Sequence, residues 1–192
     1  MRFFIALEIP KENLPSFQAI QDRLHTLLPQ ARLTNLEKIH LTLAFVGEQP
    51  EELKGKLIEL IRNSVKNTPP FAVTPAYIDG FPNIHEPQVL WIGTKGDIDK
   101  ILLIAKRITE GLEDLNLPID ERRFIPHITI AKELTEAVTH TVLAEATQQW
   151  AHFEGEAAFR VESLTLVRQV SDNRWDDLAP IPLGVFLAPS HR

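Results

Sequence analysis

Residues 38–45 read Lys-Ile-His-Leu-Thr-Leu-Ala-Phe, and residues 125–132 read Ile-Pro-His-Ile-Thr-Ile-Ala-Lys. Both stretches share the order His, apolar, Thr, apolar, Ala, and both are rich in residues that favour β-strands. Every second side chain of a strand points to the same face, about 6.5–7 Å apart. Each stretch therefore places an imidazole beside a hydroxyl, above apolar side chains that face a core.

The two polar pairs are His40 with Thr42 and His127 with Thr129. Histidine titrates near neutral pH, so one ring can accept a proton while the other, protonated, donates one. The threonine hydroxyls can donate hydrogen bonds to phosphate oxygens, where negative charge builds up in a transition state. Two such pairs at one cleft predict phosphoryl chemistry with no metal ion and no other cofactor. The residues alone leave open which histidine is the acid and which the base.

Outward from the two motifs, the chain alternates short β-rich runs with helical periodicity. Helices are expected where apolar residues recur every three or four positions, at residues 14–28, 51–66, 97–115 and 135–149. Asp97 is the expected N-cap of the third helix. Strands are expected at residues 2–9, 39–46, 71–78, 89–93, 124–130, 153–159 and 161–170. No linker or low-complexity run divides the chain, so residues 1–192 are predicted to form one α+β domain with two similar lobes.

The composition excludes several classes of protein. The 192 residues are 44% hydrophobic and 24% charged, which is ordinary for a globular protein. No cysteine is present, which excludes a disulfide framework, thiolate metal sites and cysteine nucleophiles. The net charge of −6 argues against a broad basic face for duplex DNA or an anionic membrane. No secretory or membrane-spanning segment is recognisable, so the expected location is the cytoplasm, and nothing requires a protein partner or more than a monomer.

Basic and aromatic residues near the motifs are candidates for substrate contacts. Arg122 and Lys132 flank the second motif and could bind a substrate phosphate. A small positive site on a negative chain suits an RNA 3′ end or a small cyclic-phosphate nucleotide, and does not suit an extended duplex. The aromatic residues that could stack on a base are Phe45, Phe124, Trp91 and Trp175; core packing is expected for the first three, and Trp175 stays unplaced.

Three alternative functions have to be weighed against this pattern. A metal-dependent phosphodiesterase would need clustered histidines and carboxylates, and no His-Glu-x-x-His or comparable motif is present. A non-catalytic module that binds RNA ends or nucleotides would not require both imidazoles. An enzyme with the same two pairs could also act on another small cyclic phosphate.

The chain resembles the 2H phosphoesterases, and within them the bacterial and archaeal RNA 2′,3′-cyclic phosphodiesterases, also called 2′-5′ RNA ligase-like proteins. The resemblance rests on both His-x-Thr motifs together with blocks at residues 2–7, 39–48, 80–82, 89–93 and 122–131. The chain departs from the family at Lys132, where Arg is frequent, at Ile125, where a basic residue is frequent, and over residues 168–175.

The resemblance implies a fold of two lobes related by a pseudo-twofold axis, each an antiparallel sheet backed by helices, around a central cleft. It implies hydrolysis of a 2′,3′-cyclic phosphate at an RNA 3′ end, leaving a 2′-phosphate. By the same resemblance His40 would be the proton donor to the leaving 3′ oxygen, and His127 the acceptor that activates water.

Overall fold

The computed structural model describes residues 1–135, 138–153, 155–171 and 174–184. Within these residues, nine strands form one sheet in the order β7-β4-β5-β6-β3-β1-β8-β9, and the short β2 pairs with β6. All paired strands are antiparallel. The strands are β1 (Arg2–Glu8), β2 (Arg32–Leu33), β3 (His40–Glu48), β4 (Phe71–Phe81), β5 (Val89–Gly96), β6 (His127–Lys132), β7 (Phe159–Val161), β8 (Ser163–Ser171) and β9 (Arg174–Pro182).

The strand order is symmetric about the junction of β6 and β3, where the two lobes meet. β5 flanks β6 on one side as β1 flanks β3 on the other, and β4 and β8 occupy equivalent places farther out. The lobes are joined by pairing of Leu41 with Ile128, the central apolar residues of the two motifs. The predicted α+β fold with two pseudo-twofold lobes is confirmed, and the two half-sheets are continuous with each other.

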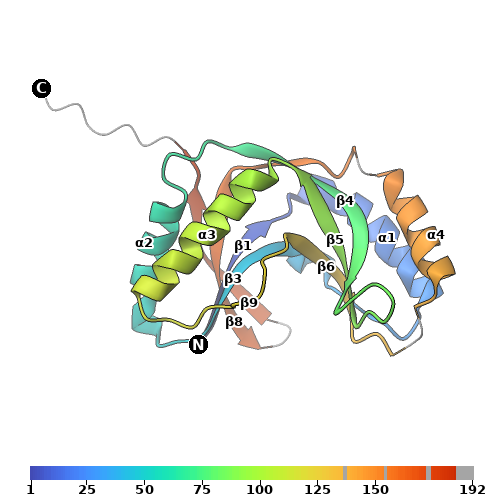
Figure 1. Cartoon of the computed structure of the whole chain (residues 1–192), viewed down its shortest axis with the longest axis horizontal. Coiled ribbons are helices and arrows are strands. Elements are labelled where there is room, and N and C mark those ends of the chain that lie inside the picture. Colours follow the sequence, from blue (N-terminus) through green and yellow to red (C-terminus); the bar gives the residue numbers. More distant parts are fainter. Residues whose placement is uncertain (136–137, 154, 172–173, 185–192) are drawn as a thin grey trace, which may run out of the picture.

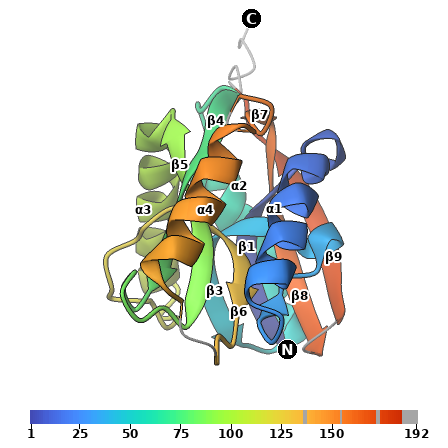
Figure 2. The ribbon, with the colours of Figure 1, turned by 90° about the vertical axis from the view of Figure 1, so that its right-hand side faces the viewer.

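Helices cover the outer face of the curled sheet and leave its inner face open (Figures 1 and 2). The helices of the described residues are α1 (Leu14–Leu27), α2 (Lys54–Ser64), α3 (Ile98–Asp114) and α4 (His140–Ala151), with 3-10 turns at Lys11–Asn13, Leu36–Lys38 and Glu51–Leu53. The chain crosses between lobes, because α1 follows β1 but contacts β6, and α3 follows β5 but contacts β3. None of these helices is long and apolar enough to cross a membrane.

One predicted strand is wrong, the strand predicted at 161–170 begins in β7 and continues as β8, and the strands β2 and β9 were not predicted. The strand expected at 153–159 is wrong: Phe153 and residues 155–158 form turns and coil, residue 154 lies outside the described residues, and only Phe159 begins a strand. The strand β9 was not predicted, because it contains two prolines and two aspartates, which are rare in central strands. β9 lies at one edge of the sheet, where such residues are tolerated.

Helix boundaries agree more closely with the periodicity. The predicted helix 135–149 appears as α4 from His140, and residues 136–137 of that prediction lie outside the described residues. Asp97 does precede α3, but its side chain makes no capping hydrogen bond there. Its carboxylate instead accepts a hydrogen bond of 3.0 Å from the Ala72 backbone N–H, so it links the helix start to β4.

Candidate active site

The two polar pairs lie side by side on the open face at the centre of the sheet. In an antiparallel pair joined at Leu41 and Ile128, His40 lies across from Thr129, and Thr42 lies across from His127. All four side chains are partly exposed, whereas Leu41 and Ile128 between them are fully buried in the core. The alternation predicted from the sequence is therefore confirmed at both motifs.

The strand β3 carries a β-bulge directly after its polar pair. Its pairing with β1 passes from Thr42 to Ala44 and leaves Leu43 without a partner. Leu43 is buried and Ala44 packs against the same core, so Phe45 returns to the open face. Phe45 is 61% exposed, and the prediction that it belongs to the core was wrong because a bulge interrupts strict alternation.

The strand β6 carries the equivalent bulge. Its pairing with β5 passes from Thr129 to Ala131 and leaves Ile130 without a partner. Ile130 and Ala131 are both fully buried, so Lys132 returns to the open face. The charge of Lys132 helps to lower the pKa of His40, which places this lysine within electrostatic reach of the other motif.

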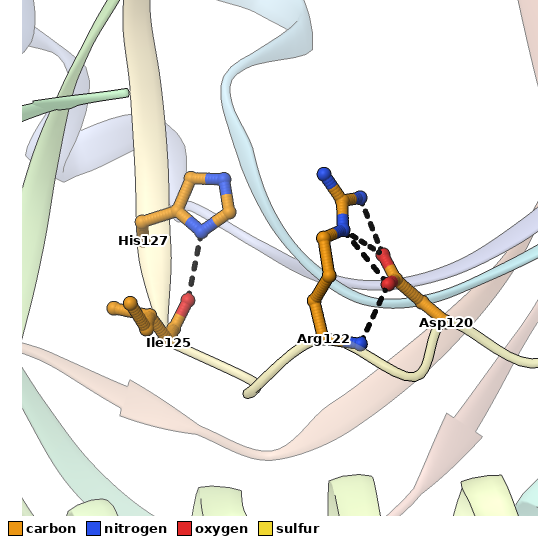
Figure 3. A network of polar contacts seen from close by, with 4 residues as sticks. All are labelled: Asp120, Arg122, Ile125 and His127. Atoms are coloured by element: carbon orange, nitrogen blue, oxygen red, sulfur yellow. Dashed lines mark hydrogen bonds and ion pairs between the residues drawn. The ribbon is translucent and has the colours of Figure 1, made fainter. Parts of the chain in front are cut away.

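Both imidazoles are held by the backbone in the same way. Nδ1 of His40 lies 2.7 Å from the carbonyl oxygen of Lys38, and Nδ1 of His127 lies 2.8 Å from that of Ile125 (Figure 3). A carbonyl can only accept a hydrogen bond, so Nδ1 carries a proton in both rings and Nε2 is the atom that exchanges one. Nε2 of His40 lies 2.9 Å from Oγ1 of Thr42.

Aromatic rings enclose His40 on two sides. Phe4 of β1 stacks on it at a centroid distance of 5.1 Å, and Trp175 of β9 meets it edge-on at 5.0 Å. The Lys38 ammonium lies 5.2 Å from the centroid of the same indole. The missed strand β9 therefore supplies one wall of the site, and Trp175, which the sequence left unplaced, contacts a motif histidine.

Aromatic rings from the other lobe enclose His127. Phe81 of β4 lies edge-on at a centroid distance of 4.9 Å, and Trp91 of β5 lies at 5.6 Å. Trp91 is buried, as predicted, and Phe81 was not singled out in the sequence. Only pairing of distant strands brings these rings to the motif, so their contact with His127 could not be predicted from the local sequence.

Burial lowers the pKa of both histidines. For His40, desolvation is opposed by the hydrogen bond to the Lys38 carbonyl and by the Glu8 carboxylate, while His127 and Lys132 lower the pKa further. For His127, desolvation is opposed by the hydrogen bond to the Ile125 carbonyl. Because a charge on His127 disfavours a charge on His40, the pair favours a state with at most one proton on the two Nε2 atoms.

Arg122 lies in the loop before β6 and is ion-paired with Asp120 (Figure 3). Its Nε donates to Oδ1 of Asp120 at 2.8 Å, and the guanidinium lowers the pKa of that carboxyl to about 2. The loop and the end of β3 enclose a groove of about 530 Å³, lined by Phe45, Val46, Gly47 and residues 118–122. Arg122 thus lines a groove that Phe45 of β3 also lines, whereas Lys132 lies on the same face of β6 as His127 and Thr129.

No group of three or more histidines and carboxylates in the described ranges is placed to hold a metal ion. The groups that the two motifs and their neighbours present on the open face are two imidazoles, two hydroxyls and the ammonium of Lys132.

The sequence profile of the 2′-5′ RNA ligase superfamily matches residues 17–173. An RNA 2′,3′-cyclic phosphodiesterase of Methanocaldococcus jannaschii is 34% identical over 135 residues, covering 69% of this chain and 71% of the relative. The Escherichia coli protein of the same name is 30% identical over 139 residues, covering 72% and 75%.

Solved structures share the fold over nearly the whole chain. A Thermus thermophilus protein is 25% identical with a TM-score of 0.79, covering 95% of this chain and 98% of that one. Escherichia coli LigT, solved in complex with 3′-AMP, is 22% identical with a TM-score of 0.73, covering 95% and 97%. With both motifs inside the matched range, the chain belongs to the 2′-5′ RNA ligase superfamily.

Proposed function

We propose that this chain is a phosphoric diester hydrolase that converts RNA 2′,3′-cyclic phosphate ends to 2′-phosphates. The observation that carries the proposal is the pairing of Leu41 with Ile128, which brings two imidazoles and two hydroxyls to one face. Both rings keep Nε2 free of the backbone, as proton transfer requires. The relatives named for this activity support the substrate class.

In the proposed reaction, His127 and His40 act on opposite sides of the phosphorus. Nε2 of His127 accepts a proton from water, and the water oxygen forms a bond to phosphorus. The bond from phosphorus to the 3′ oxygen breaks, and His40 donates its Nε2 proton to that oxygen. The product carries a 2′-phosphate and a 3′-hydroxyl, and exchange with solvent restores the two protonation states.

The threonines stabilise the phosphate while it gains charge. Thr42 and Thr129 stand across from the opposite lobe's histidine, so each hydroxyl can donate to a non-bridging oxygen held between the rings. Proton transfer and hydrogen bonding then account for the whole reaction, and no metal ion or cofactor takes part. An anionic phosphodiester also favours protonation of one imidazole, which offsets the lowered pKa of His40.

The surroundings suit the end of a single strand. Lys132, on the open face, is proposed to contact the phosphate, and Arg122 in the adjacent groove to contact the next phosphate along the RNA. Phe45 is the exposed aromatic residue of this groove and can stack on a base. Two cations on a chain of net charge −6 fit an RNA end or a small cyclic nucleotide better than a duplex.

Residues 1–192 are proposed to work as one bilobal unit, because each lobe supplies one histidine and one threonine to the same reaction. Such a unit needs no second protein, and a monomer suffices. The cytoplasm is the proposed location of the enzyme, because the proposed substrate is an RNA end.

The decisive test is incubation of the purified protein with an oligoribonucleotide that ends in a 2′,3′-cyclic phosphate. Chromatography against 2′- and 3′-phosphate standards should identify a 2′-phosphate product. His40→Ala and His127→Ala should each lose about 10²–10⁴-fold in kcat, because each removes a proton-transfer partner. The double variant should be little worse than the worse single one, because residues that act as a unit are not additive. His152→Ala, an exposed histidine on the outer face, is the matched control.

Other outcomes would point to the alternatives. Tight binding of the oligonucleotide without turnover would indicate a binding module. Hydrolysis of a small cyclic phosphate but not of the RNA end would indicate a different substrate, and a His40→Ala protein with near-normal activity would remove the mechanism.

A further inference from the structure

Tyr77, the only tyrosine of the chain, belongs to β4, but its side chain reaches over β5. Its direct cross-strand partner on β5 is Gly93. The end of the phenol ring covers Gly93 so closely that an added Cβ atom would overlap Cζ, Cε2 and the hydroxyl oxygen. Because glycine has no side chain, the end of Tyr77 that carries the hydroxyl occupies the space above β5.

This position places the Tyr77 hydroxyl next to the strand that carries a motif histidine. Gly93, which lies under the hydroxyl, is also the direct partner of His127 on β6. The Cα atoms of directly opposite residues in antiparallel strands lie about 4.5–5.5 Å apart. On its other side, His127 lies across from Thr42 of β3. Along this line across the sheet, a hydroxyl therefore stands on each side of the imidazole.

Tyr77 lies on the open face of the sheet. Along β4, Tyr77 is exposed and Asp79 is partly exposed, whereas Ile78 between them is buried. The phenol ring meets the indole of Trp91 edge-on at a centroid distance of 5.9 Å, and Trp91 in turn contacts His127. Because 39% of Tyr77 stays exposed, a ligand on this face can reach the side chain.

The Tyr77 hydroxyl is available for a ligand. Within the described ranges it makes no hydrogen bond to a backbone or side-chain group. Asp79, the carboxylate on the same face of β4, accepts instead from the Gly80 backbone N–H at 2.7 Å. A phenol hydroxyl can donate a hydrogen bond, as the threonine hydroxyls can. Its neighbours on the open face, His127 and Lys132, suit an anion, so the matching ligand group is a phosphate oxygen.

We propose that Tyr77 is a further substrate-binding residue, whose hydroxyl donates a hydrogen bond to a non-bridging oxygen of the phosphate held at His127. Gly93 is its positioning residue, because the missing side chain admits the ring. The other lobe has no such hydroxyl, since Glu8 is the cross-strand partner of His40 on β1. The effect on turnover rests on the proposed function, but the contact with a phosphate can be measured without turnover.

The first test is the binding of adenosine 2′-phosphate, which carries the end group of the proposed product, to the full chain. Because Tyr77 is the only tyrosine, labelling with ¹³C-tyrosine gives a single Cζ signal in the NMR spectrum. Saturation with adenosine 2′-phosphate should shift this signal, and adenosine, which lacks the phosphate, should leave it in place. Equal shifts with both ligands, or no shift with the phosphate, would overturn the proposal.

The second test is Tyr77→Phe, which keeps the ring over Gly93 and removes only the hydroxyl. It should lower both kcat/KM on a cyclic-phosphate oligonucleotide and the affinity for adenosine 2′-phosphate roughly tenfold, the lower end for a hydrogen bond to a charged group. Thr26→Val, which removes a hydroxyl from α1, is the matched control and should change neither. Unchanged affinity and kcat/KM in Tyr77→Phe would overturn the proposal.

Gly93→Ala tests the positioning role. The added Cβ atom should push the hydroxyl away and lower kcat/KM in the unmodified protein, but it should add little in Tyr77→Phe, because both changes remove the same hydrogen bond. Fully additive losses would overturn the role of Gly93. A protein whose Tyr77 signal responds to adenosine 2′-phosphate but that does not hydrolyse cyclic phosphates would leave this inference standing and refute the proposed function.

Discussion

The two threonines provide a sharp test of the site, because the structure makes them chemically unequal. Thr42 Oγ1 lies 2.9 Å from Nε2 of His40. His127 is hydrogen-bonded through Nδ1 to the Ile125 carbonyl. In the described part of the chain, the Thr129 hydroxyl makes no hydrogen bond to His127 that would correspond to the one between Thr42 and His40. Replacing either threonine by valine removes the hydroxyl and keeps the branched shape that suits a strand. Both side chains are partly exposed, so the variants should fold.

The expected loss follows from one hydrogen bond to a charged group. Such a bond contributes about 1.5–3 kcal/mol, which corresponds to roughly 10- to 150-fold in kcat/KM. Thr42→Val and Thr129→Val should each lose activity in this range on a cyclic-phosphate oligonucleotide. Only Thr42→Val should also move the NMR titration of His40, because only Thr42 contacts its Nε2 in the free protein.

Steady-state kinetics and the titration together separate the two effects. Thr26→Val, at an exposed threonine of α1, serves as the matched control and should leave both measurements unchanged. Full activity in both motif variants would show that the hydroxyls do not hold the phosphate. A titration shift of His40 in Thr129→Val would show that the free site differs from the geometry described above.

Three further predictions follow from the same geometry. Hydrolysis should persist in excess EDTA, and loss of activity that a divalent ion restores would indicate a metal site. Phe45→Ala should lower kcat/KM on RNA roughly tenfold, which is in the lower part of the range for base stacking, with little loss of stability. The same variant should hydrolyse a cyclic ribose phosphate that has no base as fast as the unmodified protein does. An equal loss of kcat/KM on both substrates would refute stacking. The free energy of unfolding, measured with urea, should fall as the pH drops below about 6.5, because the pKa values of His40 and His127 are lowered in the folded state and the unfolded chain binds more protons below that pH. The double variant His40→Gln, His127→Gln should lose the part of the pH dependence that these two histidines cause. A double variant with the same slope of stability against pH as the unmodified protein would contradict this prediction.

The local order of residues is enough to assign the four polar side chains of the two motifs to their strand faces. Alternation within a strand is a local property, so His40 with Thr42 and His127 with Thr129 could be assigned to common faces without any tertiary information. The repetition of the pattern then predicted two lobes, and the pairing at Leu41 and Ile128 bears this out.

The surroundings of these four residues depend on the pairing and packing of distant strands. A bulge changes which face the next side chain takes, and it depends on the partner strand, so the places of Phe45 and Lys132 could not be read from alternation. The edge strand that carries Trp175 has a composition typical of a loop, and only its pairing with β8 makes it a wall of the site. The register that sets Glu8 against His40 and Gly93 against His127 joins residues far apart in the chain. Such contacts depend on the packing of the whole sheet, and they distinguish two histidines whose local sequences are nearly the same.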